Sequence, residues 1–117
     1  MNAVVVSDEQ FCDIEKAVGE SVFLQFDFTL WLPPGVTITS AVCSCTSLAD
    51  GSSHPEIISG AATVLPGGAI AQQMVTAGVS LTRYAVTAQA TFSDTQSRAL
   101  SAKMKVVPYL YGARTAP

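Results

Sequence analysis

Histidine is the side chain most suited to proton transfer near neutral pH, and this chain of 117 residues contains one, His54. A hydrolytic triad would have to be built around it. His54 lies in the run DGSSHP (residues 50–55), which is dense in turn formers and lacks the glycine-flanked serine of a nucleophile elbow. We therefore expect an exposed loop histidine and no catalytic residue.

Three cysteines, Cys12, Cys43 and Cys45, are the other candidates for reactive or metal-binding chemistry. A structural zinc site needs four ligands with paired spacing, and Cys12 and His54 do not supply a second pair. Cys43 and Cys45 are two positions apart, which in an extended strand separates their Cα atoms by about 7 Å, at or beyond the disulfide limit. We expect three reduced thiols, no metal and no cofactor.

Acidic side chains concentrate near the start of the chain, at Asp8, Glu9, Asp13, Glu15 and Glu20. A calcium loop needs oxygen ligands at alternating positions around a central glycine, and these residues do not have that spacing. Glycine-rich phosphate-binding patterns are also missing from the sequence. A solvated acidic face is the expected role, and the sequence predicts no small-molecule substrate.

Composition excludes several classes of protein. Hydrophobic residues make up 49% and charged residues 13%, which predicts a folded chain with a substantial core. The net charge of -3 has the wrong sign for neutralising phosphates, so no nucleic-acid partner is expected. The longest apolar stretch, residues 22–32, is interrupted by polar residues and is shorter than the roughly 20 residues of a membrane span, so no membrane partner is expected.

Charge is unevenly distributed along the chain. Residues 1–60 carry eight acids and one base, a net charge of -7, whereas residues 61–117 carry one acid and five bases, a net charge of +4. Neighbouring strands of one domain could pair these charges. Alternatively, the acidic edge of one copy could meet the basic edge of the next in a repeating assembly. Both explanations remain open from the sequence.

The strongest strand signal spans residues 22–32, where every even position is apolar. Pro33-Pro34-Gly35 ends this strand, because proline cannot donate to a sheet and glycine permits the turn. A second strand is predicted over residues 36–46. Its apolar positions change phase, which predicts a β-bulge near residues 39–40.

Shorter strands are predicted over the rest of the chain. Residues 56–65 and 69–76 form two weak strands, and residues 84–92 and 100–106 form a hairpin across the polar connection 93–96. Their shared phases predict a core that contains Leu24, Phe26, Phe28, Tyr84, Val86 and Phe92.

Residues 7–17 are the one segment with helical signals. Ser7 and Gln10 have capping-box spacing, and Asp8 and Glu9 would favour a helix N-terminus. An irregular lead-in followed by a strand fits equally well. Since the remaining signals are short strands broken by turns about ten residues apart, the predicted fold is all-β, an antiparallel sandwich or barrel.

The order of these strands and the segment 78–88 resemble an immunoglobulin-like domain. In such a domain Tyr84 would open the penultimate strand, and its hydroxyl would bond back to the preceding corner. The chain more narrowly resembles small immunoglobulin-like phage virion proteins that serve as fiber-tail adaptors. The residues that carry this resemblance are Phe26-Asp27-Phe28-Thr29, Leu32, Thr37-Ile38, Ala41 and Tyr84.

The resemblance covers residues 22–107 and implies an antiparallel immunoglobulin-like sandwich. We divide the chain into an N-terminal arm or lead-in (1–19), the sandwich (20–107) and a C-terminal tail (108–117). The two extended arms are predicted to reach neighbouring chains. Since the start of the sequence lacks the basic and apolar regions of a secretory signal, synthesis in the host cytoplasm is expected.

The resemblance implies a non-enzymatic structural protein of a tailed-phage virion, an adaptor that joins tail or portal-proximal components such as fibers to the particle. Its partners would be other virion proteins and copies of itself in an oligomer, and its location the virion. Tyrosine and arginine are enriched in interface hot spots, which favours the tail as a contact. The candidate interface residues are Val4, Val5, Val6, Trp31, Tyr109, Tyr111 and Arg114.

Two alternatives remain. A capsid decoration subunit of similar fold would use the same kinds of contact. A carbohydrate- or cell-surface-binding module would need an exposed aromatic platform, for which Trp31 and Phe23, both at odd positions of the first strong strand, are the candidates.

Overall fold

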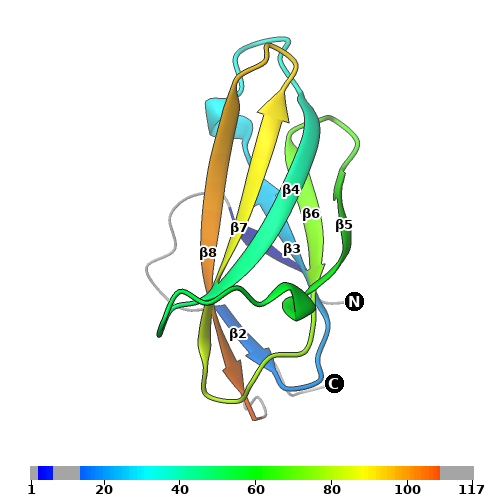
Figure 1. The fold of residues 1–117 in the computed structure, drawn as a ribbon. Helices are drawn as coiled ribbons and strands as arrows, with labels where there is room; N and C mark the ends of the chain where they lie inside the picture. The colour runs from blue at the N-terminus through cyan, green and yellow to red at the C-terminus, as the bar shows by residue number, and fades with distance from the viewer. Residues whose placement is uncertain (1–2, 7–13, 109–117) are drawn as a thin grey trace.

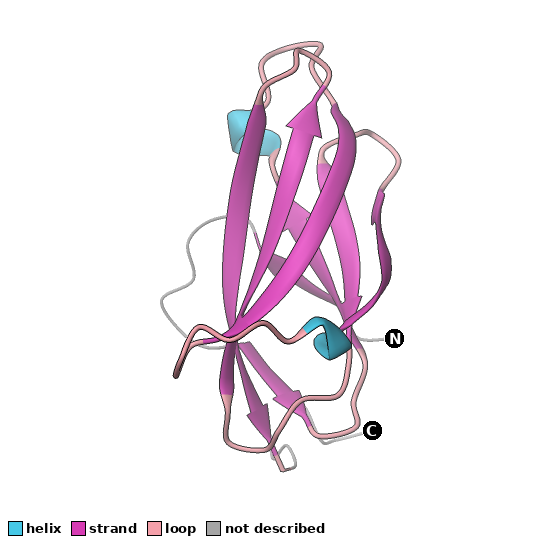
Figure 2. Cartoon of the chain, in the orientation of Figure 1, coloured by secondary structure: helices cyan, strands magenta, loops and turns pink. Residues whose placement is uncertain are grey.

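The computed structural model describes residues 3–6 and 14–108. The described residues form eight β-strands and two single-turn 3-10 helices, η1 and η2 (Figures 1 and 2). The strands are β1 (Ala3–Val6), β2 (Ile14–Ala17), β3 (Val22–Asp27), β4 (Ile38–Ser47), β5 (Ile58–Val64), β6 (Ile70–Val75), β7 (Arg83–Phe92) and β8 (Ser97–Val107). Predictions that concern Cys12, Tyr109, Tyr111 and Arg114 fall outside the described residues.

The strands are arranged in two four-stranded sheets that form a sandwich. Sheet A has the order β1-β3-β6-β5, and sheet B has the order β2-β8-β7-β4. Figure 1 shows β8, β7 and β4 side by side as one layer in front of β3 and β6. The predicted all-β sandwich is confirmed. None of the helices in the described part of the chain is long and apolar enough to cross a membrane.

The predicted antiparallel pairing holds for four of the six pairs of neighbouring strands and differs at one edge of each sheet. β1 runs parallel to β3, and β2 runs parallel to β8, whereas the other neighbours are antiparallel. Side-chain alternation predicts which residues face the core but carries no information about strand direction, because every residue except proline offers the same backbone donor and acceptor. The direction of β1 and β2 therefore could not be predicted from their residues.

A helix and an irregular lead-in followed by a strand were the two alternatives for residues 7–17, and the described part of this segment is a strand. Residues 14–17 form β2, so a helix that continues to residue 17 is wrong. Lys16, in the middle of this strand, is fully buried, and its ammonium group donates to the carbonyl oxygens of Ala77 (2.6 Å) and Ala17 (2.9 Å). Burial lowers the pKa of Lys16, and the nearby Glu20 carboxylate opposes that effect. Lys16 thereby ties β2 to the loop between β6 and β7.

The first strong strand is shorter than predicted. β3 ends at Asp27, and the chain then turns through η1 (Thr29–Trp31). The Asp27 carboxylate accepts a hydrogen bond from the Thr29 backbone N–H at 2.9 Å, a local contact that competes with continued sheet pairing. Leu30, which continues the apolar pattern of the even positions, is 76% exposed as a result.

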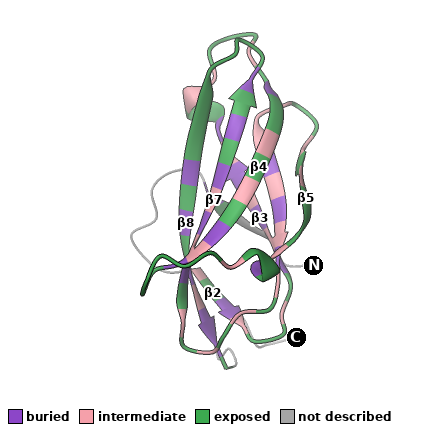
Figure 3. Ribbon diagram, viewed as in Figure 1, coloured by how far each residue is buried: buried purple, intermediate pink, exposed green. Residues whose placement is uncertain are grey.

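The core lies between the two sheets. Figure 3 shows buried and exposed residues alternating along β7 and β8, as period-two patterning requires. Phe28 directly follows β3 of sheet A, and Phe92 ends β7 of sheet B. The two rings pack edge to face with their centroids 6.0 Å apart. All six predicted core residues are buried: Leu24, Phe26, Phe28, Tyr84, Val86 and Phe92.

The remaining strand predictions hold with adjusted boundaries. The register of β4 against β7 shifts between Ile38 and Ser40, which confirms the predicted bulge. The predicted strand over residues 56–65 begins later, because Pro55–Ile57 form η2 before β5 starts. Proline suits the first turn of a helix and disfavours a ladder position. The predicted hairpin is confirmed by the antiparallel pairing of β7 with β8.

Tyr84 makes the hydrogen bond that the resemblance implied. The Val79 backbone N–H donates to the Tyr84 hydroxyl at 3.0 Å, and the tyrosine side chain is buried. The bond closes the corner between β6 and β7 and satisfies the phenol oxygen in the core. This corner positions the loop between β6 and β7, residues 76–82.

Gln73 is a second buried polar residue that sequence reasoning missed. Its amide group donates to the carbonyl oxygens of Ser59 and Gly60, next to the point where the register of β5 against β6 shifts between Ser59 and Thr63. The buried amide N–H groups of Gln73 need acceptors, and the carbonyls of Ser59 and Gly60 beside the irregular pairing supply them.

Candidate protein interface

The loop around His54 holds an ordered hydrogen-bond chain. The Ser52 hydroxyl oxygen lies 3.0 Å from His54 Nε2, and His54 Nδ1 lies 2.8 Å from a Glu56 carboxylate oxygen. This is the order of groups in a hydrolytic triad. The Ser52 hydroxyl, however, donates to the Asp50 carboxylate at 2.7 Å, so its proton is directed away from the imidazole. These hydrogen bonds stabilise the loop.

The carboxylates of Asp50 and Glu56, at the two ends of this hydrogen-bond network, are held in the ionised form. Hydrogen bonds from Ser52 lower the pKa of Asp50, and the hydrogen bond from the His54 side chain lowers the pKa of Glu56. These four residues recur at every second position, from the turn after β4 at Asp50 to Glu56 in η2. That spacing was the signal in the sequence that could have revealed the network.

Cys43 and Cys45 are free thiols on β4. Cys45 is buried and Cys43 is half-buried, and burial raises the pKa of each thiol to about 11. Among the described residues, no three His, Cys, Asp or Glu side chains lie close enough together to hold a metal ion.

The raised pKa values predict that these two thiols react slowly in the native protein. At pH 8 a thiol whose pKa is about 11 instead of 9.0 has roughly a hundredth of the ordinary thiolate fraction, and the thiolate is the nucleophile. Alkylation by iodoacetamide, followed by peptide mass spectrometry, should label Cys43 and Cys45 far more slowly before unfolding in urea than after it. Rapid labelling of both in the folded protein, or recovery of stoichiometric zinc, would contradict the prediction.

Trp31 lies in η1 and not on β3, so the structure does not place it on one strand face with Phe23. The indole is half-buried against Phe28, with ring centroids 6.4 Å apart, and the Arg98 guanidinium lies 5.0 Å from the centre of its ring. A stacked guanidinium occupies the position that a sugar ring would take on an aromatic platform.

The N-terminal candidates fall into different environments. Val5 is 53% exposed, whereas Val6 is fully buried in the core. Val4 lies in β1 in register with Leu24 of β3. Of these three valines, Val5 is the one whose described side chain offers surface to another molecule.

An apolar surface that sequence reasoning missed lies at one end of the sandwich. It combines exposed aliphatic side chains from the turn after β2, the loop after β4 and the loop before β7, the last of which is at the lower end of Figure 1. Leu81 is 70% exposed and Val79 is 65% exposed. We call this surface the apolar end; it consists of Val18, Leu48, Val79 and Leu81.

Backbone hydrogen bonds hold these separate segments together. The N–H of Val18 donates to the Val107 carbonyl (2.8 Å), and the N–H of Leu81 donates to the Val106 carbonyl (2.6 Å), so both segments are fixed to the end of β8. The Leu48 N–H donates to the Arg83 carbonyl at 3.0 Å. Backbone hydrogen bonds therefore anchor all three connections to the ends of β7 and β8.

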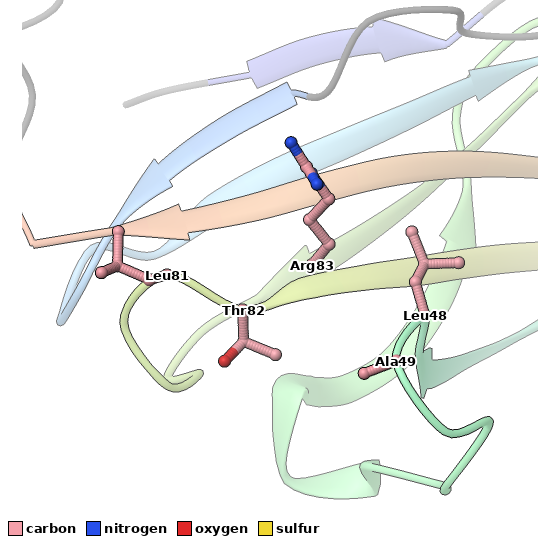
Figure 4. Close-up of a pocket in the computed structure, with 5 residues that line it drawn as sticks. All are labelled: Leu48, Ala49, Leu81, Thr82 and Arg83. Carbon is pink, nitrogen blue, oxygen red and sulfur yellow. The ribbon is translucent and has the colours of Figure 1, made fainter.

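A hollow of about 320 Å³ opens between the loop after β4 and the start of β7. Figure 4 shows the side chains around it on these two segments. The residues that line the hollow are Leu48, Ala49, Leu81, Thr82 and Arg83.

Three basic side chains lie beside this hollow on the outer face of sheet B. Arg83 of β7 is directly opposite Lys105 of β8, and Lys103 is opposite Ala85 two positions further along. The intervening residues Tyr84 and Met104 face the core, which leaves the bases on the solvent side. We call Arg83, Lys103 and Lys105 the basic cluster. Much of the positive charge of the second half of the chain is therefore collected at one end of one sheet.

Comparison with known proteins agrees with the resemblance inferred from the sequence. Residues 16–105 match the model of the family described as podophage GP4 fiber-tail adaptor protein gp77. The match begins in β2 and ends in β8, and so includes the strands that build the core, the apolar end and the basic cluster. Neither a search of curated proteins nor a search of solved structures returned a match. Since the family model covers well over half of its length, this chain belongs to the podophage GP4 fiber-tail adaptor gp77 family.

Proposed function

We propose that this protein is a non-enzymatic adaptor that joins tail or portal-proximal components, such as fibers, to the particle of a tailed phage. The observation that carries the proposal is the family match over residues 16–105. The structure supports it with a rigid two-sheet core and with exposed apolar and charged surfaces at the ends and edges of that core. An adaptor needs surfaces of this kind because it must hold two partners at a defined separation.

The partners in this proposal are other virion proteins and further copies of the same chain. β1 is an edge strand of sheet A and exposes Val5, and edge strands are natural sites for pairing with an extended segment. Tyr109, Tyr111 and Arg114 of the tail supply residue types that dominate interface energetics. Assembly occurs in the virion, after synthesis in the host cytoplasm.

A capsid decoration subunit would have the same fold and would differ in its position on the particle. The carbohydrate-binding alternative is not supported by the aromatic residues, because Arg98 lies over the ring of Trp31. The adaptor and decoration functions are therefore the two to separate by experiment.

Particles assembled without this protein are expected to lack fibers and to retain a filled capsid. Electron microscopy and quantitative mass spectrometry of purified particles would measure fiber content, and adding the purified protein should restore it. Particles that keep their fibers in its absence would contradict the adaptor function. Density for the protein on the capsid faces would assign it to decoration.

A further inference from the structure

Leu81 combines two unfavourable features at one position. Its φ of 65° lies in the left-handed region, where a Cβ atom crowds the backbone and where glycine or asparagine is usual. Its side chain is 70% exposed, so the described fold holds this conformation through the hydrogen bond from the Leu81 N–H to the Val106 carbonyl and not through side-chain packing. Strained positions of this kind are common where a residue serves binding.

The basic cluster adds an unfavourable arrangement at the same end. Arg83 and Lys105 are directly opposite each other on one face of an antiparallel pair, where like charges repel. Glu15 of β2 lies opposite Lys105 on its other side and offsets part of this charge. Lys103 lies two positions from Lys105 in the same strand and faces the same side.

The hollow shares lining residues with both the apolar end and the basic cluster. Leu48, Ala49 and Leu81 give it apolar walls, and Arg83 belongs both to its lining and to the basic cluster. A surface with an apolar depression and a positively charged margin is complementary to an apolar side chain surrounded by carboxylates.

We propose that the apolar end and the basic cluster together form the docking site for an acidic partner protein, whose apolar side chain enters the hollow beside Leu81. This inference rests on the proposed function and specifies the chemistry of one of its partners. The bases steer and orient the partner, and Leu81 provides the apolar contact. The unfavourable conformation of Leu81 is retained because that contact forms in the complex.

Two variants test the site without damaging the core. Leu81→Gly removes the apolar side chain and relieves the backbone, so its melting temperature should equal or exceed that of the wild type. Lys103→Ala with Lys105→Ala removes two charges from the outer face of β8. The matched control, Gln89→Glu with Thr91→Glu, changes the net charge by the same amount at exposed positions toward the other end of β7.

The assay measures binding of each purified full-length protein to particles assembled without it, by co-sedimentation at low and high salt. We expect Leu81→Gly and the double lysine variant each to weaken binding by about tenfold or more, and the lysine variant also to lose much of the salt dependence. The control should bind like the wild type. Unchanged binding by both test variants would overturn the proposed site while the adaptor function stands, whereas failure of the wild type to bind would count against the adaptor function itself.

Other occupants give different results. If sedimentation equilibrium shows that the wild type self-associates and Leu81→Gly does not, the occupant is a second copy, and the separate partner is overturned. Binding of the wild type to phosphatidylglycerol vesicles that is lost in the lysine variant would assign the surface to lipid and would also overturn the proposal. If particle binding is lost only on removal of residues 109–117, the contact belongs to the tail and not to this site.

Discussion

Phe26→Ala is expected to lower the free energy of unfolding by about 3 to 5 kcal/mol, the usual cost of truncating a fully buried phenylalanine. The Phe26 side chain has no exposed surface. It lies in β3, which is held on both sides, by β1 in register at Val6 and by β6 in register at Ala71. Because both neighbours are fixed by backbone hydrogen bonds, the strands cannot collapse into the space that the ring leaves.

Urea denaturation followed by circular dichroism would measure this loss. Phe23→Ala is the matched control, since Phe23 is in the same strand but points to the outer face of sheet A and is half-buried. Its loss should be clearly smaller, because solvent can fill the vacated space. An unfolding midpoint that Phe26→Ala does not move would show that the sandwich core is assigned incorrectly.

Removal of residues 109–117 is expected to leave thermal unfolding unchanged and to abolish incorporation into the particle. We expect the sandwich to fold without these residues because its last strand, β8, ends at Val107, before the removed segment. A stable interface buries about 1,600 Å² in total, which a small sandwich can reach more readily with an extending segment than with its sheet faces alone. Tyr109, Tyr111 and Arg114 are the residues expected to dominate that contact.

The test pairs calorimetry of the truncated protein with its incorporation into particles that lack the wild-type chain. A shorter truncation, of residues 115–117, keeps both tyrosines and Arg114 and should incorporate normally. If the chain that lacks residues 109–117 assembles like the wild type, the tail has no role in assembly. If instead its melting temperature falls sharply, the tail stabilises the fold.

The same separation between stability and assembly applies to Leu81 and Phe26. Phe26 is buried in a relaxed strand, and its loss should affect folding first. Leu81 is exposed and has a left-handed backbone, so its replacement by glycine should affect docking and not folding. Measuring both stability and particle binding for each variant would distinguish these roles.

Alternation in the sequence was sufficient to predict most of the core and the hairpin of β7 with β8. Each side chain in a strand faces the side opposite to its neighbour, so burial on one face leaves a period-two pattern that can be read locally. This is why Phe26, Val86 and Phe92 were assigned correctly, and why a phase change in β4 revealed its bulge. Tyr84 was recognised from a family resemblance, because its hydrogen bond to Val79 depends on a corner that alternation does not describe.

Leu30, Lys16 and the parallel pairing of β1 and β2 were decided by contacts that alternation does not encode. The Asp27 carboxylate turned the chain after β3 and exposed Leu30, although the apolar pattern continued through it. Lys16 can be buried because its ammonium group donates hydrogen bonds to the carbonyl oxygens of its neighbour Ala17 and of Ala77 in the distant loop between β6 and β7. The backbone groups that pair one strand with another are the same in every residue except proline, so local sequence does not specify the neighbour or the direction of a strand.

The apolar end depends even more fully on tertiary structure. Val18, Leu48, Val79 and Leu81 are far apart in the chain and come from three different connections. Each by itself is an ordinary exposed aliphatic residue. Backbone hydrogen bonds to β8 and to the start of β7 bring the three connections near the basic cluster. Pairing between strands that are distant in the sequence is set by the packing of the whole domain. The sequence alone therefore determined the core faces and the family, whereas tertiary pairing determined where a partner could dock.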